Sequence, residues 1–372
     1  MKTESPGNNP LTGASRCGGE FLASDPISTS SPSHMAEVSP SQLIPLNNLD
    51  SYRRYFTDAA FWTPFVSLVG ERHGFDITGD SRSGLPGTFP TFIVSNRWVV
   101  KFFGPLFDGL SCFQVEQTTS HLIPSQEFPV PALLASGQLF PPGSANWIWP
   151  YLIYEYVPAP SIGEVYSQVS YTSKLALARE LGFLLQRIHR LSLPADSSFC
   201  PNWQSYQKLL TQQMSGCQER HATWGSLPER LLSEIPSYLL HPSDLIPFSL
   251  APSLIHADLT RDHLLGHLLP GGEWKLQAII DFGDALSGDL FYELVVLHLE
   301  IFDADLHLLH SFLETYQPSR FHRQDFVRKA MNLTLLHVFD PFCILYERHP
   351  ELRQSSCLDE LANLLWNVNA TF

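Results

Sequence analysis

The sequence predicts an α+β protein in two lobes, a small β-rich N-terminal lobe followed by a larger helical lobe. β-Branched and aromatic runs gather between residues 85 and 157, whereas apolar residues spaced three and four apart dominate after residue 160. We therefore expect three segments: a Ser/Pro/Gly-rich disordered tail over 1–45, an N-lobe over 46–157, and a helical C-lobe over 158–372.

Composition sets limits on the class of protein. Apolar residues make up 44% of the 372 residues and charged residues 16%, which favours a folded core. The net charge of −14 argues against a nucleic-acid partner, because such proteins need Lys and Arg to displace counterions. The six cysteines form no C-x-x-C pair, which indicates reduced thiols. With no secretory signal and no apolar run of 18 residues, we expect a cytoplasmic protein without a membrane partner.

The tail is predicted from its residue types. Of the first 40 residues, 22 are Ser, Thr, Pro, Gly or Asn, and Phe21 is the only aromatic residue. Such a segment buries too little apolar surface to offset the entropy lost on ordering.

The N-lobe elements follow from strand and helix patterns. The turn pair Ser95-Asn96 separates two runs rich in β-branched and aromatic residues. The expected elements are, in order, a helix over 51–60, strands over 91–94 and 97–103, a helix over 110–123 and a buried strand over 149–157.

The C-lobe begins with the clearest amphipathic helix of the chain. Residues 173–191 place Leu177, Leu181 and Leu184 on one face. The further expected elements are two or three helices over 203–240, strands over 253–259 and 274–282 around a turn at Pro270, and helices over 289–316, 322–346 and 356–368.

Two aspartates carry the strongest chemical signal. Asp258 in HADLTRDH and Asp281 in IIDFGDA are 23 residues apart, and each follows an apolar, strand-like run. Buried strands rarely end in a carboxylate that has neither a partner nor a task. Two carboxylates at one site suit phosphoryl transfer, in which one accepts the proton of a hydroxyl and the other holds Mg²⁺ against the phosphates.

These motifs, with the helix LGFLLQRIHRL over 181–191, resemble the aminoglycoside phosphotransferase / choline kinase family, small-molecule kinases of the protein-kinase-like fold. The resemblance covers roughly residues 65–320. It implies that Asp258 is the catalytic base, that His256 braces its loop, and that Asp281 is a metal ligand. It further implies ATP and Mg²⁺ as cofactors and a hydroxyl group of a small molecule as the phosphate acceptor.

The resemblance also implies nucleotide-binding residues in the N-lobe. Lys101, on the strand VVKFF, would contact the α- and β-phosphates, and Glu116, 15 residues later, would be its partner. The remaining candidates are two glycines at the turn before the first strand and two residues of the expected hinge: Gly84, Gly87, Glu155 and Val157.

The chain departs from the family pattern at one metal position. The family has an Asn five residues after the base, where this chain has His263. Because imidazole suits softer ions than Mg²⁺, this change would shift the metal preference toward Mn²⁺. A protein kinase is not expected, because Thr260 stands where those enzymes have Lys, and no A-P-E segment follows Asp281.

An acidic stretch suggests the charge of the acceptor. Residues 281–305 hold seven acids and no Lys or Arg, and in the related enzymes such helices bind substrate ammonium groups. Glu300, Asp303 and Asp305 are therefore candidates for binding a cationic acceptor, with a solvated acidic helix face as the alternative.

Two other functions are compatible with parts of the sequence. His256 and Asp258 also begin an H-x-D…H triad of non-haem iron oxygenases, with His298 or His310 as the third ligand, although the helical pattern over 289–316 argues against that fold. A kinase-like module with weak or no activity, which binds nucleotide or a partner, is the second alternative, suggested by His263. The sequence does not indicate an oligomeric state.

Overall fold

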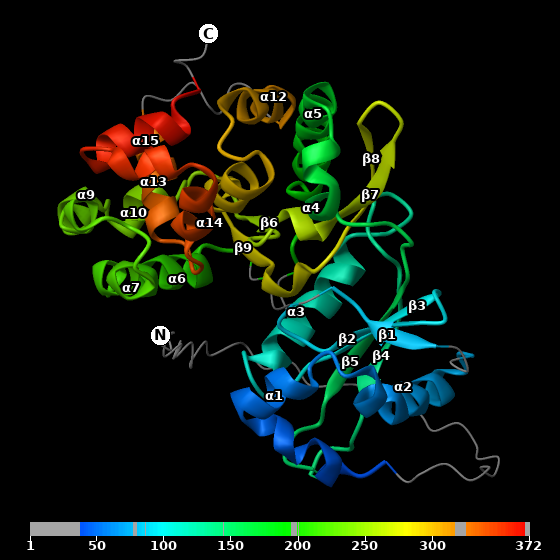
Figure 1. Cartoon of the computed structure of the whole chain (residues 1–372). Helices are drawn as coiled ribbons and strands as arrows, with labels where there is room; N and C mark the ends of the chain where they lie inside the picture. Colours follow the sequence, from blue (N-terminus) through cyan, green and yellow to red (C-terminus); the bar gives the residue numbers. More distant parts are fainter. Residues whose placement is uncertain are drawn as a thin grey trace.

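The computed structural model confirms the mixed α+β fold and its two lobes (Figure 1). It describes residues 38–76, 80–85, 87–143, 145–194, 199, 201–316 and 325–368. The expected tail up to residue 37 lies outside the described residues, so its disorder stays a prediction.

The N-lobe is built on one antiparallel sheet of five strands in the order β1-β2-β3-β5-β4. The predicted strands at 91–94 and 97–103 are β2 and β3, joined by the turn at Ser95 and Asn96, and the strand at 149–157 is β5. The bounds are Ser81–Ser83 for β1, Thr91–Val94 for β2, Trp98–Phe102 for β3, Leu133–Gln138 for β4 and Pro150–Glu155 for β5. The short strands β1 and β4 were not predicted.

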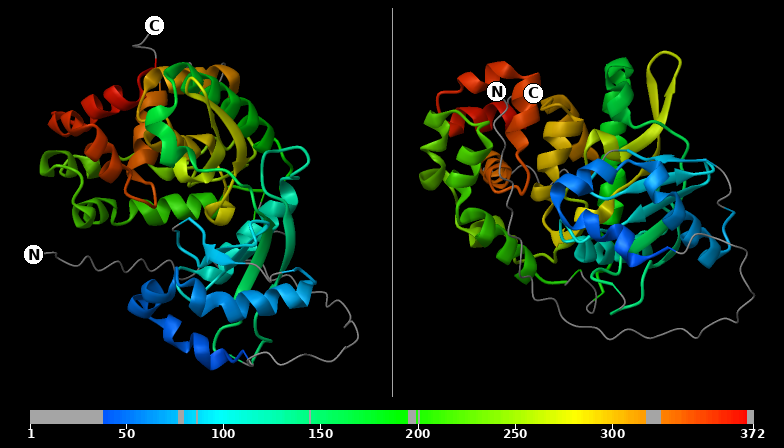
Figure 2. Two further views of the ribbon diagram at one scale, coloured as in Figure 1. Left: turned by 45° about the vertical axis from the view of Figure 1, so that its right-hand side comes forward. Right: turned by 60° about the horizontal axis from the view of Figure 1, so that its bottom comes forward.

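The two faces of this sheet have different coverings because side chains alternate along a strand. Val100 and Phe102 of β3 point into a large aromatic core shared with α2 (Ala59–His73), whose Trp62 is fully buried. Figure 2 shows α1 (Leu49–Tyr55) and α2 on the side of the sheet away from the helical lobe. The other face of β3 carries Lys101 and is covered in part by α3 (Gly109–Leu122).

The folded N-lobe begins earlier than the expected boundary at residue 46. Residues Pro40–Asn47 form a 3₁₀ helix capped by Ser39, and both Leu43 and Leu46 are buried in the aromatic core under the sheet. The apolar residues of this segment are too few to predict a helix from the sequence. The end of the assigned tail is thus part of the lobe.

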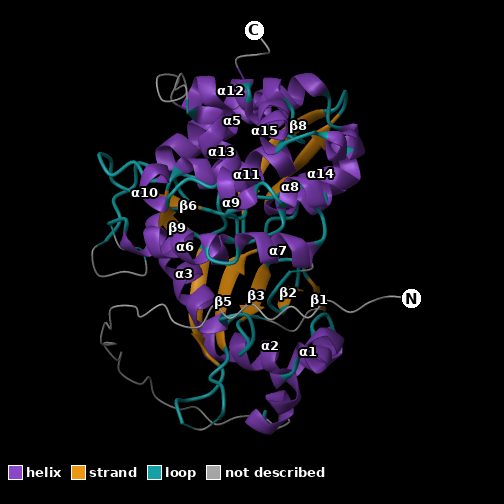
Figure 3. Ribbon diagram, turned by 90° about the vertical axis from the view of Figure 1, so that its left-hand side faces the viewer, coloured by secondary structure: helices purple, strands orange, loops and turns teal. Residues whose placement is uncertain are grey.

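The C-lobe is mainly helical, as predicted, and Figure 3 shows its helices gathered beyond the sheet of the N-lobe. Its longest helix, α5 (Tyr171–Ile188), packs along α12 (Leu306–Tyr316). The other helices are α4 (Ile162–Val165), α6 (Gln204–Met214), α7 (Cys217–Trp224), α8 (Glu229–Leu232), α9 (Ile235–Tyr238), α10 (Pro242–Leu245), α11 (Leu290–Val296), α13 (Phe326–Leu335), α14 (Pro341–Arg348) and α15 (Leu358–Trp366).

Two small hairpin-like sheets lie at the entrance of the C-lobe, and their pairing differs from the expectation. The turn after Pro270 joins β7 (Leu264–Leu269) to β8 (Glu273–Ile279). The expected strand at 253–259 is shortened to β6 (Ser253–Ile255), which pairs instead with β9 (Leu286–Gly288). Each aspartate therefore lies in the loop that follows a short strand: Asp258 follows β6, and Asp281 follows β8.

The helix expected over 289–316 is interrupted. After α11 the chain makes a π-helical turn over Leu297–Ile301, and Asp303 and Ala304 then take left-handed conformations with φ of 58° and 56° before α12 begins. A wide turn of this kind reorients the side chains that follow it. No helix in the described ranges is long and apolar enough to cross a membrane.

Candidate active site

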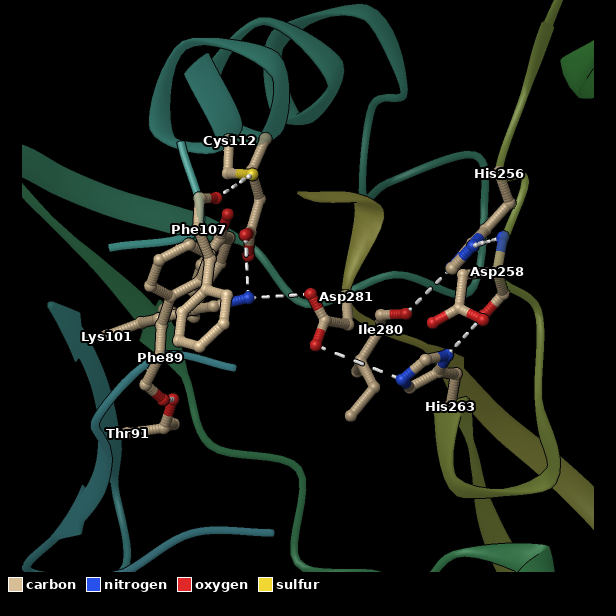
Figure 4. Close-up of polar contacts among 12 residues, drawn as sticks. Phe89, Thr91, Lys101, Phe107, Cys112, His256, Asp258, His263, Ile280 and Asp281 are labelled. Carbon is tan, nitrogen blue, oxygen red and sulfur yellow. Dashed lines mark hydrogen bonds and ion pairs between the residues drawn. The ribbon is translucent and has the colours of Figure 1, made fainter. Parts of the chain in front are cut away.

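Lys101 connects the two lobes. It lies on β3, and its ammonium Nζ is 2.8 Å from Glu116 Oε2 and 2.6 Å from Asp281 Oδ1 (Figure 4). Only 7% of Lys101 is exposed, so the ammonium would be costly to bury without these two carboxylates. Although burial favours the neutral amine, Asp281 and Glu116 raise the Lys101 pKa above its ordinary value. The lysine is therefore charged and fixed between α3 and the loop after β8.

Glu116 is buried on the face of α3 that meets the sheet. Burial raises the pKa of its carboxyl to about 7, against the opposing effect of the Lys101 ammonium. Close packing continues at Gly283, where a Cβ atom would lie 3.4 Å from both Glu116 Oε2 and Asp281 Oδ1. The D-F-G glycine therefore lies directly against the carboxylate–lysine–carboxylate contact.

A cavity of about 590 Å³ opens beside Lys101 between the sheet and the loops of the C-lobe. Its volume is in the range of sites for cofactor-sized ligands. The nucleotide-binding candidates all line it, together with both metal candidates: Gly84, Gly87, Lys101, Glu116, Glu155, Val157, His263 and Asp281. The structure therefore brings residues from six separate segments of the sequence to one cavity.

The loop that carries Asp258 is held by buried contacts beneath it. Ala257 has a left-handed backbone with φ of 66°, and its N–H donates to Glu293 Oε2 at 2.9 Å. Glu293 is 1% exposed on α11. Because a left-handed alanine is strained, it persists where the surroundings fix it. Glu293 does so here, and no sequence motif pointed to this role.

His256 braces the same loop from the other side. Its Nε2–H donates to the Ile280 carbonyl at 2.9 Å, and its Nδ1 accepts from the Asp258 N–H at 3.4 Å. These two contacts need a neutral ring with the proton on Nε2. Burial, together with the nearby His263, lowers the pKa of His256 to about 3, which agrees with a neutral ring. His256 thus ties the Asp258 loop to the residue preceding Asp281.

His263 lies on the rim of the cavity, close to both aspartates. Its Nδ1 is 2.6 Å from the Asp258 carbonyl oxygen, and since a carbonyl only accepts, Nδ1 carries the proton of the neutral ring. The other nitrogen, Nε2, is 3.9 Å from Asp281 Oδ2 (Figure 4). In the neutral ring, Nε2 and the carboxylate oxygen both present lone pairs, an arrangement that a shared cation would stabilise.

The charges around Asp258 are unbalanced. Burial raises the pKa of the Asp258 carboxyl to about 8, and the carboxylates of Asp284, Asp281, Glu300 and Glu293 add to the shift. Burial and Asp281 likewise raise the Asp284 pKa. A cation beside these groups would relieve the repulsion, so the charges fit a divalent metal.

The ligand set fits Mg²⁺ bound jointly with phosphates. No cluster of three or more His, Cys, Asp or Glu side chains arranged to hold a metal exists within the described residues. Mg²⁺ in nucleotide sites usually takes only one or two protein ligands and completes its shell with phosphate oxygens and water. Asp281 Oδ2 and His263 Nε2, which lie 3.9 Å apart, are the candidate pair of protein ligands.

The three acids expected to bind ammonium groups have other partners. Arg348 Nη1 lies 3.0 Å from Glu300 Oε2, and Arg261 Nη2 lies 3.0 Å from Asp303 Oδ1. Asp305 Oδ1 accepts from the backbone N–H groups of His307 and Leu308, at the start of α12. Their role in substrate binding stays a prediction, but the alternative of a solvated acidic face does not describe them either.

The histidines of the iron-site alternative are placed elsewhere. His298 Nε2 donates to the Leu365 carbonyl at 2.7 Å inside the helical core, and His310 Nε2 is 3.2 Å from Glu314 on α12. Neither contact involves His256 or Asp258. The helical environment of both residues agrees with the argument made from the sequence.

Sequence reasoning missed several residues around the site. Tyr52 of α1 donates through its hydroxyl to the Thr88 carbonyl at 2.9 Å, and Thr88 lines the cavity in the loop after Gly87. Arg261 and Arg348 were missed because their partners lie 42 and 48 residues away in the chain. The only hint in the sequence was that residues 281–305 contain no Lys or Arg, so any basic partner of these acids must lie outside that stretch.

The comparisons with known proteins agree with this geometry. The model of the phosphotransferase enzyme family, APH, matches residues 87–326, more than half of the chain. That span starts in the loop over the cavity and includes every candidate catalytic and metal residue.

Solved structures show the same fold at low identity. The GDP complex of wild-type aminoglycoside 2'-phosphotransferase-IIIa is 21% identical, with a TM-score of 0.54 over 82% of this chain and 98% of that one. The complex of spectinomycin phosphotransferase APH(9)-Ia with ADP and spectinomycin is 12% identical, with a TM-score of 0.50 over 81% of this chain and 97% of that one. These matches show the protein-kinase-like fold.

One curated relative is a much longer protein. Lysine-specific demethylase JMJ21 of Arabidopsis thaliana is 21% identical over 283 residues, which are 61% of this chain and 30% of that protein. This chain therefore spans about a third of the relative's length. Fold, cavity and family match together support one conclusion: the chain belongs to the phosphotransferase enzyme family.

Proposed function

We propose that this protein is an ATP-dependent kinase that transfers a phosphoryl group to a hydroxyl of a small molecule. The observation that carries the proposal is the contact of Lys101 with both Glu116 and Asp281, beside a cavity that also adjoins the Asp258 loop. An ammonium fixed at this point can bind the α- and β-phosphates of a nucleotide. Relatives of the same fold have been solved with GDP or ADP, which supports a nucleotide ligand.

In this proposal Asp258 orients the acceptor hydroxyl and accepts its proton. The carboxyl is partly buried on a loop that His256 and Glu293 hold from two sides, so its position is defined before a substrate arrives. Its raised pKa strengthens it as a base once it is ionised. General base catalysis of this kind typically contributes about 10²–10⁴-fold to the rate.

Asp281 and His263 would hold Mg²⁺, or Mn²⁺, which when bound neutralises charge on the phosphates. Asp281 is already ionised, because Lys101 holds its pKa well below the usual range despite burial. Gly84, Gly87 and Thr88 would cover the phosphates with backbone N–H groups, and the backbone of Glu155 and Val157 would contact the base. A compound with amino groups is the acceptor expected from the sequence, and relatives were solved with kanamycin and spectinomycin.

The test is a panel of hydroxyl compounds, with and without amino groups, incubated with ATP or GTP and Mg²⁺ and read as release of nucleoside diphosphate. We expect acceptor-dependent release by the wild type and none by Asp258→Asn. Asp359→Asn is the matched control, since that carboxylate is exposed on α15 and pairs with Arg328. Nucleotide binding without transfer to any acceptor would instead support a kinase-like module without activity.

A further inference from the structure

The turn between α11 and α12 forms one wall next to the Asp258 loop. It carries Glu300 in the π-helical turn and Asp303 in the left-handed stretch after it. Glu300 lies close enough to Asp258 for its charge to add to the raised pKa of that carboxyl. Two carboxylates at this place are what an acceptor with ammonium groups would need.

Arg348, however, reaches both carboxylates from α14. Its Nη1 is 3.0 Å from Glu300 Oε2 and 3.3 Å from Asp303 Oδ1, and it also donates to the Glu300 carbonyl at 3.2 Å. Arg348 is the last residue of α14, whose Phe342 and Leu345 are buried in the core. The guanidinium is therefore brought to this wall by a helix that is itself firmly packed.

Arg261 reaches the same wall from the Asp258 loop. Its Nη2 is 3.0 Å from Asp303 Oδ1, and its guanidinium lies 3.4 Å from the ring centre of Tyr166. The Tyr166 hydroxyl donates to the Ile301 carbonyl at 2.8 Å, so the stacking ring is anchored on the same turn. Only 12% of the Arg261 side chain is exposed.

The two carboxylates and two guanidinium groups cancel in charge. Glu300 and Asp303 have 18% and 33% of their side chains exposed, and each is within ion-pair distance of a guanidinium nitrogen. An incoming ammonium group would have to displace a guanidinium that already makes two or three contacts. Such a displacement contributes little binding free energy, because one cation replaces another and the packed contacts of the guanidinium are lost.

We propose that Arg348 and Arg261 occupy the positions at which this wall would otherwise bind substrate ammonium groups. The part of the acceptor that contacts the wall is then uncharged, as in a hydroxyl compound such as a polyol. This inference rests on the proposed function for the identity of the acceptor site. It replaces the cationic acceptor expected from the acidic sequence with a neutral one. Arg348 then acts as a specificity-determining residue rather than a catalytic one.

The test measures binding of a polycation, kanamycin, by calorimetry without nucleotide, so it does not depend on finding an acceptor. We expect weak or undetectable binding to the wild type. Arg348→Met keeps the aliphatic stem and frees the Glu300 carboxylate, while Asp303 keeps its contact with Arg261. We expect this variant to bind kanamycin at least about tenfold more tightly. Arg348→Lys keeps the charge and should behave as the wild type. The double variant Arg348→Met/Glu300→Gln should lose the gain.

Three results would overturn the proposal. Tight kanamycin binding by the wild type that Glu300→Gln or Asp303→Asn weakens would show that the acids are free to bind ammonium groups. Equal affinity of the wild type and a folded Arg348→Met would show that Arg348 does not control access. If Arg348→Met does not melt cooperatively, the test is the kanamycin affinity of the single variants Glu300→Gln and Asp303→Asn, each compared with that of the wild type. Failure of the proposed function would appear separately, as absent diphosphate release in the acceptor panel.

Discussion

The nucleotide side and the acceptor side of the cleft differ in how closely they follow the family pattern. On the nucleotide side the Lys101 ammonium lies 2.8 Å from Glu116, the partner that the sequence resemblance implied, and 2.6 Å from Asp281. On the acceptor side Arg348 closes an acidic wall from a helix beyond the span of the family model. The residues proposed to bind phosphate thus follow the family pattern, whereas the proposed acceptor wall is closed by a residue outside the span of the family model.

The largest expected effect separates the two sides. Asp258→Asn removes the proton acceptor and keeps the side-chain shape, so we expect transfer to fall by about 10²–10⁴-fold. Binding of ATP with Mg²⁺, measured by calorimetry, should remain close to wild type because Asp258 does not line the nucleotide cavity. Loss of nucleotide binding in this variant would show that the two sides are not separable.

A change on the nucleotide side should have the opposite pattern. Asp281→Ala removes a metal ligand and one of the two carboxylates that hold Lys101. We expect metal-dependent ATP affinity to fall by at least about 10–100-fold, the loss typical even for residues one step removed from a metal. Titration of ATP with Mg²⁺ and with EDTA measures this, and equal affinities in wild type and variant would remove Asp281 from the metal site.

His263 lies between the two sides and should set the choice of metal. His263→Asn supplies an amide oxygen in place of a ring nitrogen, so we expect Mg²⁺-supported transfer to be kept or increased. The ratio of Mn²⁺- to Mg²⁺-supported activity should fall by up to about tenfold. The ratio is measured for both proteins across pH 5.5 to 8. An unchanged ratio would mean that His263 only supports the loop through its contact with the Asp258 carbonyl.

On the acceptor side, Asp258 should also affect the thermal stability of the protein when metal is absent. The Asp258 pKa is raised from its ordinary value to about 8, so this group favours the folded state at pH below about 4 and loses that contribution as pH rises through about 8. Asp258→Asn lacks the buried charge, so its melting temperature should exceed that of the wild type by about 2–4 °C for each kcal/mol relieved. The difference should be larger at pH 8.5 than at pH 5, in EDTA. A difference independent of pH would contradict the raised pKa.

The smallest effect is expected from removing the first residues of the chain. Deleting residues 1–37 should leave the melting temperature unchanged, because that segment has few apolar residues. Deleting residues 1–47 also removes Leu43 and Leu46, and burial of each leucine contributes about 1.5–3 kcal/mol. Thermal melts of the two truncated proteins should therefore differ by several degrees. A loss with the shorter deletion would show that residues before 38 pack on the fold.

Much of the N-lobe could be predicted because several of its strands have local residue patterns that are typical of β-strands. The run around Lys101 alternates between the aromatic core and the cavity, and the turn at Ser95-Asn96 marks the hairpin. β1 and β4 escaped prediction because β1 is three residues long and β4 lacks a clear alternation of exposed and buried positions. Short edge strands take their conformation from the partner strand rather than from their own residues.

The site itself could be predicted where one motif carries one role. HAD and IDFG identified Asp258 and Asp281 without any knowledge of the fold. Contacts between distant segments could not be predicted, since Arg348 on α14 and Glu300 in the π-helical turn share no motif or periodicity. Glu300 and Asp303 therefore looked unpaired in the sequence and are paired in the structure.

Phosphorus NMR of the wild type with ATP, Mg²⁺ and the acceptor panel tests the central claim most directly. The account predicts a new phosphomonoester resonance that grows in step with ADP, is absent with Asp258→Asn, and is strongest with an uncharged hydroxyl compound. ATP that binds but yields only inorganic phosphate, or stays intact with every acceptor, would contradict the claim that this cleft transfers a phosphoryl group to a small molecule.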